Sequence, residues 1–143
     1  MDRHVLDASV LIDLKKARQL RLLTNPIARG KIVVPSYVLN RLRKSSRWRT
    51  WIQRNELRVR ATFQTVAEHE LFATLVVKHG SYDSNPRVAA DDIQAITIAF
   101  CRRTPLAMRD RPAEAIARAL GVRVLSSEQL LNELAGQPAA RLF

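Results

Sequence analysis

Cysteine is almost missing from this chain of 143 residues, which carries only Cys101. One thiol cannot form an intramolecular disulfide and gives no metal-ligand spacing, so a disulfide scaffold and a cysteine-based zinc module are excluded. Because Cys101 lies in an apolar stretch with helical spacing, we predict that it is a small buried hydrophobic residue. The scarcity of cysteine also favours a reducing compartment, and we expect a cytoplasmic protein.

Long apolar runs are missing as well. No run approaches the roughly 18 residues that a membrane-spanning helix needs, so no membrane partner is expected. The opening residues 1–7 contain acidic side chains from the start, and we do not expect them to be a signal peptide. Repeats, low-complexity tracts and linker-like segments are absent, and the length suits one domain over residues 1–143, with a short tail at 136–143.

Acidic residues are few, because 13 Asp and Glu stand against 24 Lys and Arg, for a formal net charge of +11. Such an excess of positive charge raises the local concentration of polyanions. A nucleic acid or an acidic protein partner would suit this field equally. Neither a helix-turn-helix pattern nor zinc-finger spacing is visible, which argues against a DNA-binding regulator.

Strand-like and helix-like segments alternate along the chain. Helix candidates carry apolar residues three and four positions apart, and strand candidates are short apolar or alternating runs, at 5–6, 31–34, 57–61, 105–108 and 122–125. Two capping boxes, Thr65 with Glu68 and Ser126 with Gln129, predict helix starts, and Gly121 predicts a helix end. The alternation predicts an α/β fold in which a mainly parallel central sheet lies between two helical layers.

Acidic residues occur where three of these elements meet. Asp7 follows the first strand, Asp110 follows the 105–108 strand, and Asp91 and Asp92 begin the helix that contains Ile93. Since sites in parallel α/β sheets form at the carboxyl ends of the strands, we expect these carboxylates to converge. Grouped carboxylates repel one another unless a cation neutralises them, and Mg²⁺ and Mn²⁺ prefer such oxygen ligands. The sequence therefore predicts a shared acidic site that binds Mg²⁺ or Mn²⁺.

Helix capping offers some of these acids a purely structural role. Aspartate at a helix start is a favourable cap and a favourable partner for the helix dipole. We interpret Asp91 in this way, and Asp110 precedes a helix in the same manner. Asp7 has no comparable capping need beyond what Ser9 already offers.

The blocks around the acids resemble those of the PIN-domain family, which includes the VapC-type toxin ribonucleases. Residues 5–14 are similar to the opening block of that family, 92–99 to its second acidic block and 109–125 to its closing block. The resemblance implies a three-layer PIN-like fold and endoribonuclease activity that depends on Mg²⁺ or Mn²⁺. It also implies that Asp7, Asp92 and Asp110 are the catalytic metal ligands. As a further implication, the chain would be the toxin of a type II toxin–antitoxin pair, with an antitoxin protein as a partner.

One position departs from the family pattern. The family carries an acid on the helix after its second strand, in the arrangement Pro-x-x-Val-x-x-Glu-Leu, where this chain has Arg41. If Arg41 points inward, it can pair with Asp7 or Asp92 and take the place of the cation. If it points outward, Asn40 can supply a neutral oxygen instead.

Two other acids could in principle replace the missing one. We interpret Glu68 as a capping-box partner and Asp13 as a solvated side chain, so neither is expected to do so. The leading hypothesis is therefore a metal-dependent endoribonuclease with an altered acidic pocket. The alternative, which Arg41 favours, is a catalytically degenerate PIN-like domain that acts as an RNA- or protein-binding module.

The segment 41–60 holds eight basic residues against one acid, with Trp48 and Trp51 among them. Guanidinium groups for phosphates and aromatic rings for bases are the components of a groove for single-stranded RNA. We predict that the basic residues face a polyanion, and we interpret the tryptophans as core residues or as part of a homodimer seam. The expected RNA contacts are Ser9, Arg41, Arg43, Lys44, Arg47 and Arg111.

Overall fold

All five strands of the sheet run in the same direction. In the computed structural model, which describes residues 3–135, the strand order is β3-β2-β1-β4-β5 and every neighbouring pair is parallel. The strands are β1 (His4–Leu6), β2 (Ile32–Pro35), β3 (Arg60–Ala61), β4 (Leu106–Ala107) and β5 (Val124–Leu125). All carboxyl ends consequently lie along one edge of the sheet.

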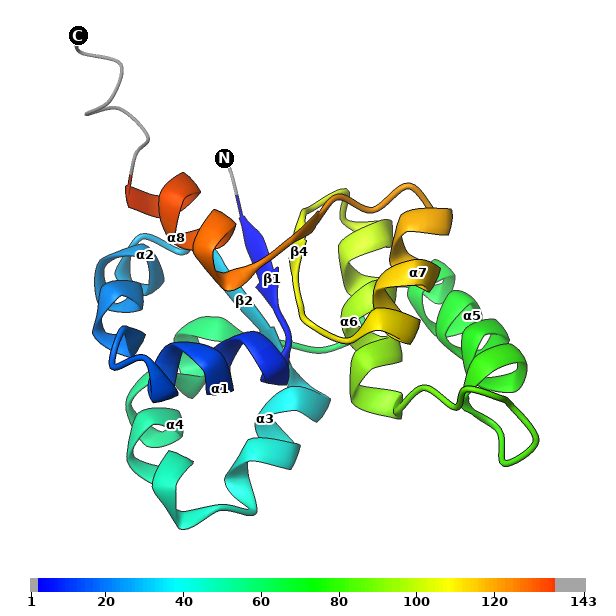
Figure 1. Cartoon of the computed structure of the whole chain (residues 1–143), viewed down its shortest axis with the longest axis horizontal. Helices are drawn as coiled ribbons and strands as arrows, with labels where there is room; N and C mark the ends of the chain where they lie inside the picture. The colour runs from blue at the N-terminus through cyan, green and yellow to red at the C-terminus, as the bar shows by residue number, and fades with distance from the viewer. Residues whose placement is uncertain (1–2, 136–143) are drawn as a thin grey trace, which may run out of the picture.

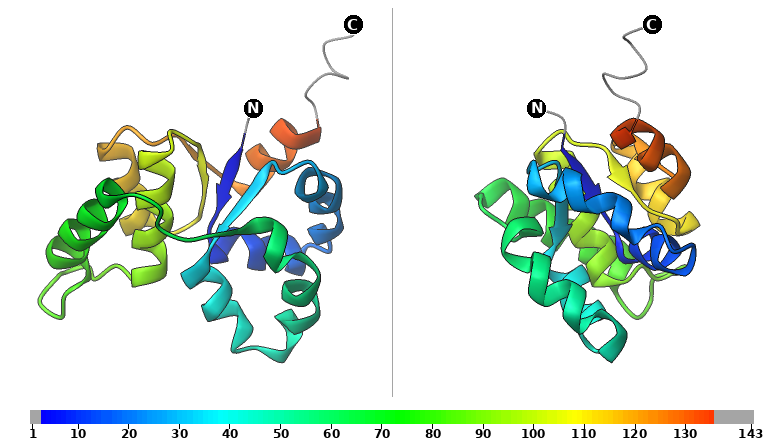
Figure 2. Two further views of the ribbon diagram at one scale, coloured as in Figure 1. Left: turned by 180° about the vertical axis from the view of Figure 1, so that it is seen from behind. Right: turned by 90° about the vertical axis from the view of Figure 1, so that its left-hand side faces the viewer.

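Helices cover both faces of this sheet and produce three layers (Figures 1 and 2). The helices α1, α2, α4 and α8 lie on one side, and α5, α6 and α7 lie on the other. Their bounds are α1 (Ala8–Lys16), α2 (Thr24–Ala28), α3 (Ser36–Arg43), α4 (Ser46–Val59), α5 (Val66–Leu75), α6 (Ala90–Cys101), α7 (Arg111–Ala119) and α8 (Ser127–Ala135). A 3-10 turn, η1 (Leu20–Leu23), precedes α2, and a π-helical turn, η2 (Val76–Gly80), follows α5.

Each face of the sheet has its own hydrophobic core. Because successive strand residues point to opposite faces, Leu6 and Val34 pack with α1 and α4, whereas Val5 and Val33 pack with α6. The predicted α/β/α architecture is confirmed. Within residues 3–135, no helix is both long and apolar enough to cross a membrane.

The predicted helix ends are also confirmed. The Thr65 hydroxyl accepts from the backbone N–H of Glu68 at 3.1 Å. At the start of α8, the Ser126 hydroxyl accepts from the Gln129 N–H at 3.1 Å, and the Gln129 side chain accepts from the Ser126 N–H at 2.8 Å. Gly121 adopts a φ of +86° after α7, a conformation that glycine tolerates best.

Two local predictions are wrong, and a third concerns residues that the structure does not describe. The 57–61 segment is not a strand of five residues, because α4 continues to Val59. Leu57 and Val59 would share one face of a strand, whereas the observed fully exposed Leu57 and buried Val59 point to opposite sides of a helix. Cys101 is only half-buried, because it is the last residue of α6. The proposed tail at 136–143 lies outside the described residues.

The two tryptophans support the hydrophobic core rather than an RNA surface. Trp48 is 5% exposed and packs in the core beneath α4, and the half-buried Trp51 contacts it edge-on at 5.6 Å between ring centroids. Their interpretation as core residues is confirmed. Any aromatic contact to RNA must therefore come from elsewhere.

Candidate metal centre

The helices α1, α6 and α7 begin near one another at the carboxyl edge of the sheet (Figure 1). Asp7 connects β1 to α1, Asp110 precedes α7 after β4, and the first turn of α6 contributes Asp91 and Asp92. The backbone N–H of Asp7 donates to the carbonyl of Ala107 at 3.0 Å, which extends the pairing of β1 and β4 up to the site. The sheet thus fixes Asp7 directly, while α6 carries the other two acids toward it.

Three carboxylates form a compact cluster at this point. Asp7, Asp91 and Asp92 each place an oxygen within 4.8 Å of oxygens of the other two, and all three residues are buried. Among the described residues, no donor reaches Asp7 Oδ1, although this atom is shielded from solvent. A buried carboxylate oxygen without a donor is costly, and a cation would satisfy it.

Ser9 links the acidic cluster to the neighbouring loop. Its hydroxyl donates to Asp7 Oδ2 at 3.2 Å and accepts from the backbone N–H of Arg109 at 2.9 Å. Asp7 has an extended conformation before α1, but its side chain does not cap that helix. Ser9 therefore orients Asp7 and fixes the β4–α7 loop beside it.

The electrostatics of the cluster favour protonation or a bound cation. Burial raises the pKa of Asp7 above its ordinary value. Burial and, next, the charge of Asp7 raise the pKa of Asp92, and the charges of Asp91 and Asp110 add to the effect. Burial and mutual repulsion thus disfavour the simultaneous ionisation of Asp7 and Asp92, and a nearby positive charge would offset both effects.

Arg41 supplies part of that positive charge. Its Nη1 lies 3.0 Å from Asp91 Oδ2, and this hydrogen bond raises the pKa of Arg41. The Arg41 side chain is 56% exposed, whereas that of Asp91 is 11% exposed, so the guanidinium lies at the mouth of the cluster. Arg41 points inward, but the expected pairing with Asp7 or Asp92 is wrong; Asn40 is exposed.

The structure changes the roles expected of two acids. Asp91 is not a helix cap, because α6 begins after Ala89 without a side-chain cap and the carboxylate turns to Arg41. Its adjacency to Asp92 in the sequence already pointed to the cluster, but the capping interpretation set that signal aside. Asp110 is half-buried and lies outside the group of three, but it is near enough for its charge to raise the pKa of Asp92.

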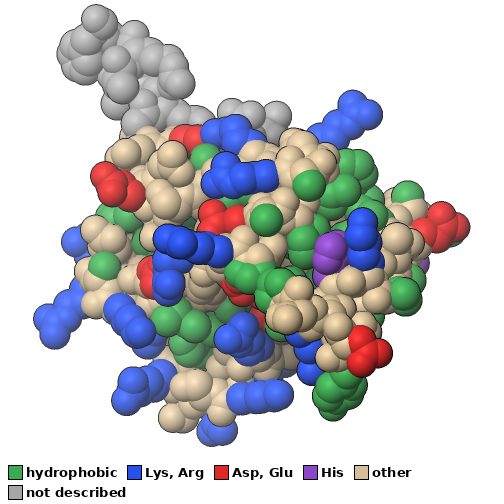
Figure 3. All heavy atoms as spheres, turned by 45° about the vertical axis from the view of Figure 1, so that its right-hand side comes forward, with side chains coloured by type: hydrophobic (Ala, Val, Ile, Leu, Met, Phe, Trp, Pro, Cys, Tyr) green, Lys and Arg blue, Asp and Glu red, His purple; other side chains and the backbone are tan. Residues whose placement is uncertain are grey.

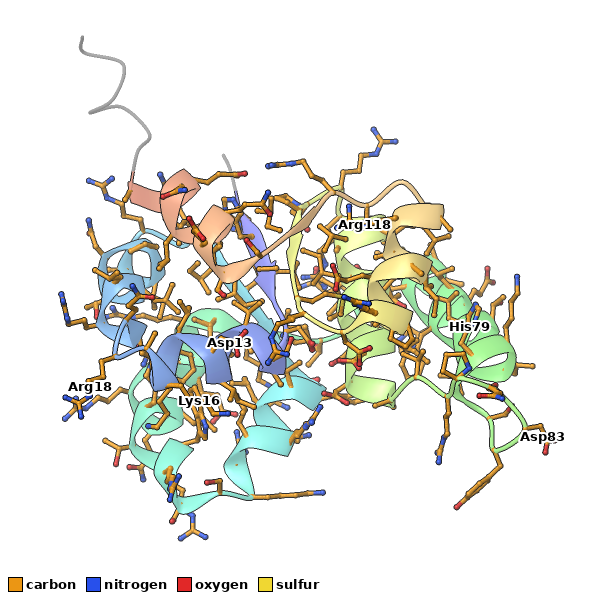
Figure 4. All side chains as sticks on the ribbon, in the orientation of Figure 1. Asp13, Lys16, Arg18, His79, Asp83 and Arg118 are labelled. Atoms are coloured by element: carbon orange, nitrogen blue, oxygen red, sulfur yellow. The ribbon has the colours of Figure 1, made fainter. Side chains whose placement is uncertain are left out.

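The other two acids considered from the sequence have separate partners. Asp13 of α1 accepts two hydrogen bonds from Arg109, at 2.7 and 2.9 Å, so its interpretation as a solvated side chain is wrong (Figure 4). Glu68 is buried and accepts from Arg102 at 2.8 Å and from the Gln64 N–H at 2.6 Å. Neither side chain contributes to the cluster.

On the face that Figure 3 shows, basic side chains are numerous and acidic side chains lie between and beside them. Of the expected RNA contacts, Lys44, Arg47 and Arg111 are exposed, whereas Arg43 forms an ion pair with Glu56. The half-buried Ser9 serves mainly to hold Asp7. The arrangement combines an all-oxygen acidic centre with a cationic rim.

Comparison with known proteins agrees with this architecture. The family model described as a PIN domain matches residues 3–137. A search of curated proteins returns no match. The matched range contains every strand of the parallel sheet and every acid of the cluster, and the chain therefore belongs to the PIN-domain family.

Proposed function

We propose that this chain is an endoribonuclease that hydrolyses RNA phosphodiester bonds with the help of Mg²⁺ or Mn²⁺. The observation that carries the proposal is the cluster of Asp7, Asp91 and Asp92, whose buried oxygens lie within 4.8 Å of one another. PIN-domain nucleases act on RNA, and the net charge of +11 favours such a polyanion.

The residues present fit a hard divalent cation. The donor set consists of carboxylate oxygens, and Asp7 Oδ1 has an unused lone pair among the described contacts. In this proposal Asp7, Asp92 and Asp110 hold the cation. Asp91 is a further candidate ligand, although Arg41 engages one of its oxygens.

The side chains of the chain perform complementary tasks in the proposed reaction. When bound, the cation lowers the pKa of a water molecule and offsets the charge that grows on the phosphate. Ser9 keeps Asp7 oriented by its hydrogen bond to Oδ2. Arg41 presents a half-exposed guanidinium at the mouth, where it can donate to a phosphate oxygen. Lys44, Arg47 and Arg111 position the RNA backbone from the rim.

The decisive experiment is cleavage of single-stranded RNA by the purified chain in the presence of Mn²⁺ and in EDTA. We expect cleavage only with the metal, and loss of cleavage in Asp7→Asn and Asp92→Asn. Asp83→Asn is the matched control, because Asp83 is exposed on the loop after η2 (Figure 4) and does not belong to the acidic cluster. A wild-type protein that cleaves no RNA with Mg²⁺ or Mn²⁺ would refute the proposal.

A second candidate function has one specific observation in its favour. The ion pair of Arg41 with Asp91 already neutralises part of the cluster, as expected of a degenerate domain that binds RNA or protein without cutting. Salt-sensitive RNA binding without cleavage supports this alternative. Gain of cleavage in Arg41→Glu would show that the remaining pocket is intact.

The toxin role within a type II toxin–antitoxin pair belongs to the same proposal, as does action in the cytoplasm. Its support is the similarity of residues 5–14 and 92–99 to VapC-type toxins. Expression of the chain in a bacterial host tests it directly. We expect growth arrest that Asp7→Asn relieves; normal growth with well-expressed wild-type protein would contradict the toxin role.

A further inference from the structure

An aromatic group lies beside the acidic cluster on the same edge of the sheet. β2 and β3 are parallel neighbours, and their carboxyl ends lead into Tyr37 and Phe63. Tyr37 packs edge-on against Phe63 and against Phe72 of α5, with ring centroids 6.4 and 5.7 Å apart. Along the edge, aromatic rings therefore follow β3 and β2, and Asp7 follows β1.

Tyr37 is firmly held, but much of its side chain is open to solvent. Its backbone N–H donates to Gln94 Oε1 at 2.8 Å, and the Gln94 amide donates to the Ser36 hydroxyl at 3.0 Å. Gln94 is 1% exposed, whereas Tyr37 is 38% exposed. An aromatic residue fixed by buried hydrogen bonds and by other rings is a preorganised surface for a flat ligand.

The surroundings of Tyr37 indicate which flat ligand fits. Tyr37 and Arg41 are four residues apart on α3 and therefore share a face of that helix. Arg41 contacts Asp91 of the cluster, and Gln94 follows Asp91 by one helical turn on α6. Neighbouring strands lie about 4.8 Å apart, so the ring after β2 is within reach of a nucleotide whose phosphate lies over Asp7.

We propose that Tyr37, supported by Phe63 and Phe72, stacks on an unpaired base next to the phosphodiester at the acidic cluster. This inference rests on the proposed function, which identifies the polyanion as RNA. Stacking tolerates any base sequence, because every base has a π face, whereas base pairs inside a duplex hide those faces. Tyr37 thus takes the role that the buried Trp48 cannot fill.

Binding of fluorescently labelled RNA to the full chain in EDTA tests this role without any cleavage. We expect Tyr37→Ala and Tyr37→Leu to weaken binding of a short single strand about 5- to 100-fold, the usual range for loss of one stacked base. Tyr37→Phe should retain wild-type affinity, since the ring is kept. Tyr82→Ala is the matched control, because Tyr82 is 91% exposed on the loop after η2. Affinity for an RNA duplex should be the same in all variants.

Two further measurements separate stacking from a general loss of structure. Tyr37→Leu preserves apolar packing, and its thermal unfolding shows whether the fold is intact. An RNA that carries 2-aminopurine should be quenched by wild type and by Tyr37→Phe, but not by Tyr37→Leu. Equal affinity of wild type and Tyr37→Leu for the single strand, or equal losses for single strand and duplex, would overturn the inference. A chain that binds through Tyr37 but never cleaves would refute the nuclease and leave the stacking role standing.

Discussion

Glu68 and Asp7 are equally shielded from solvent, with exposed fractions of 2% and 1%, but their surroundings differ completely. Glu68 accepts from the side chain of Arg102 and from the backbone N–H of Gln64, just before α5. Asp7 has one hydroxyl donor, Ser9, and faces the carboxylates of Asp91 and Asp92. One buried acid is surrounded by donors, and the other is surrounded by acids.

The pKa values of these two acids move in opposite directions. Burial alone raises the pKa of both, but at Glu68 the hydrogen bonds and charge of Arg102 outweigh burial and lower the pKa overall. At Asp7 the hydrogen bonds with Asp92, the Ala8 backbone and Ser9 lower the pKa but do not outweigh burial, and the pKa stays raised. A buried carboxylate that stabilises a fold is fully paired, whereas one that is left partly unpaired marks a place where a ligand completes the structure.

The largest expected effect separates activity from stability at Asp7. Asp7→Asn should reduce Mn²⁺-dependent RNA cleavage by about 10³-fold, because it removes a metal ligand. The same change should leave the free energy of unfolding in EDTA unchanged or higher by about 1 kcal/mol, because it removes a repelled charge. Single-turnover cleavage and urea unfolding measure the two quantities. A clearly destabilised Asp7→Asn protein would show that this carboxylate has a structural role after all.

A bound metal should stabilise the protein through Asp7 and not through Glu68. At a Mn²⁺ concentration of 100 times the dissociation constant, we expect the free energy of unfolding to rise by about 2.7 kcal/mol. The increase should disappear in Asp7→Asn and persist in Glu68→Gln, since Glu68 does not belong to the cluster. Thermal unfolding with and without Mn²⁺ measures it. An unchanged increase in Asp7→Asn would place the binding site elsewhere.

Loss of the Glu68 carboxylate should lower the free energy of unfolding. Glu68→Gln leaves Arg102 without its charge partner, and we expect a destabilisation of about 2 kcal/mol at pH 7. The loss is moderate because Arg102 is partly exposed, and water can solvate the unpaired guanidinium. A lowered pKa in the folded state gives stability above the unfolded pKa, and that stability is lost as pH falls through the folded pKa. The difference between wild type and Glu68→Gln should therefore shrink in acid. Urea midpoints at pH 7 and pH 3 test this, and Glu70→Gln, at an exposed residue on the same helix, is the control.

The layered fold and two members of the cluster follow directly from the sequence. Alternating strands and helices dictate the parallel sheet, and a parallel sheet dictates that Asp7 lies at its carboxyl edge. Asp92 was also expected there, as the acid at the start of α6. These features depend on periodicity and strand direction, which are local properties of the chain.

The pairing of Arg41 with Asp91 could not be predicted in the same way. It depends on how α3 packs against α6, which is set by buried contacts such as Gln94 with Ser36 across 58 positions of the chain. The alternation at 57–61 was ambiguous for a related reason, because Val59 can face a core from a helix or from a strand. Long-range packing, and not local pattern, decides such cases.

The smallest expected effect concerns Arg41. It makes one hydrogen bond to one acid of the cluster, Asp91, whereas Arg102 makes two hydrogen bonds to Glu68. Arg41→Ala should free Asp91 and raise the affinity for Mn²⁺ about 5- to 10-fold, because a competing positive charge is removed. It should also weaken RNA binding in EDTA and make that binding less sensitive to salt, since one phosphate contact is lost. Calorimetric titration with Mn²⁺ and RNA binding at several salt concentrations measure the two changes, with Arg43→Ala as the control for charge. Opposite signs for metal and RNA are the signature of a guanidinium that lies between them, and a fall in both affinities would show that Arg41 only supports the local structure.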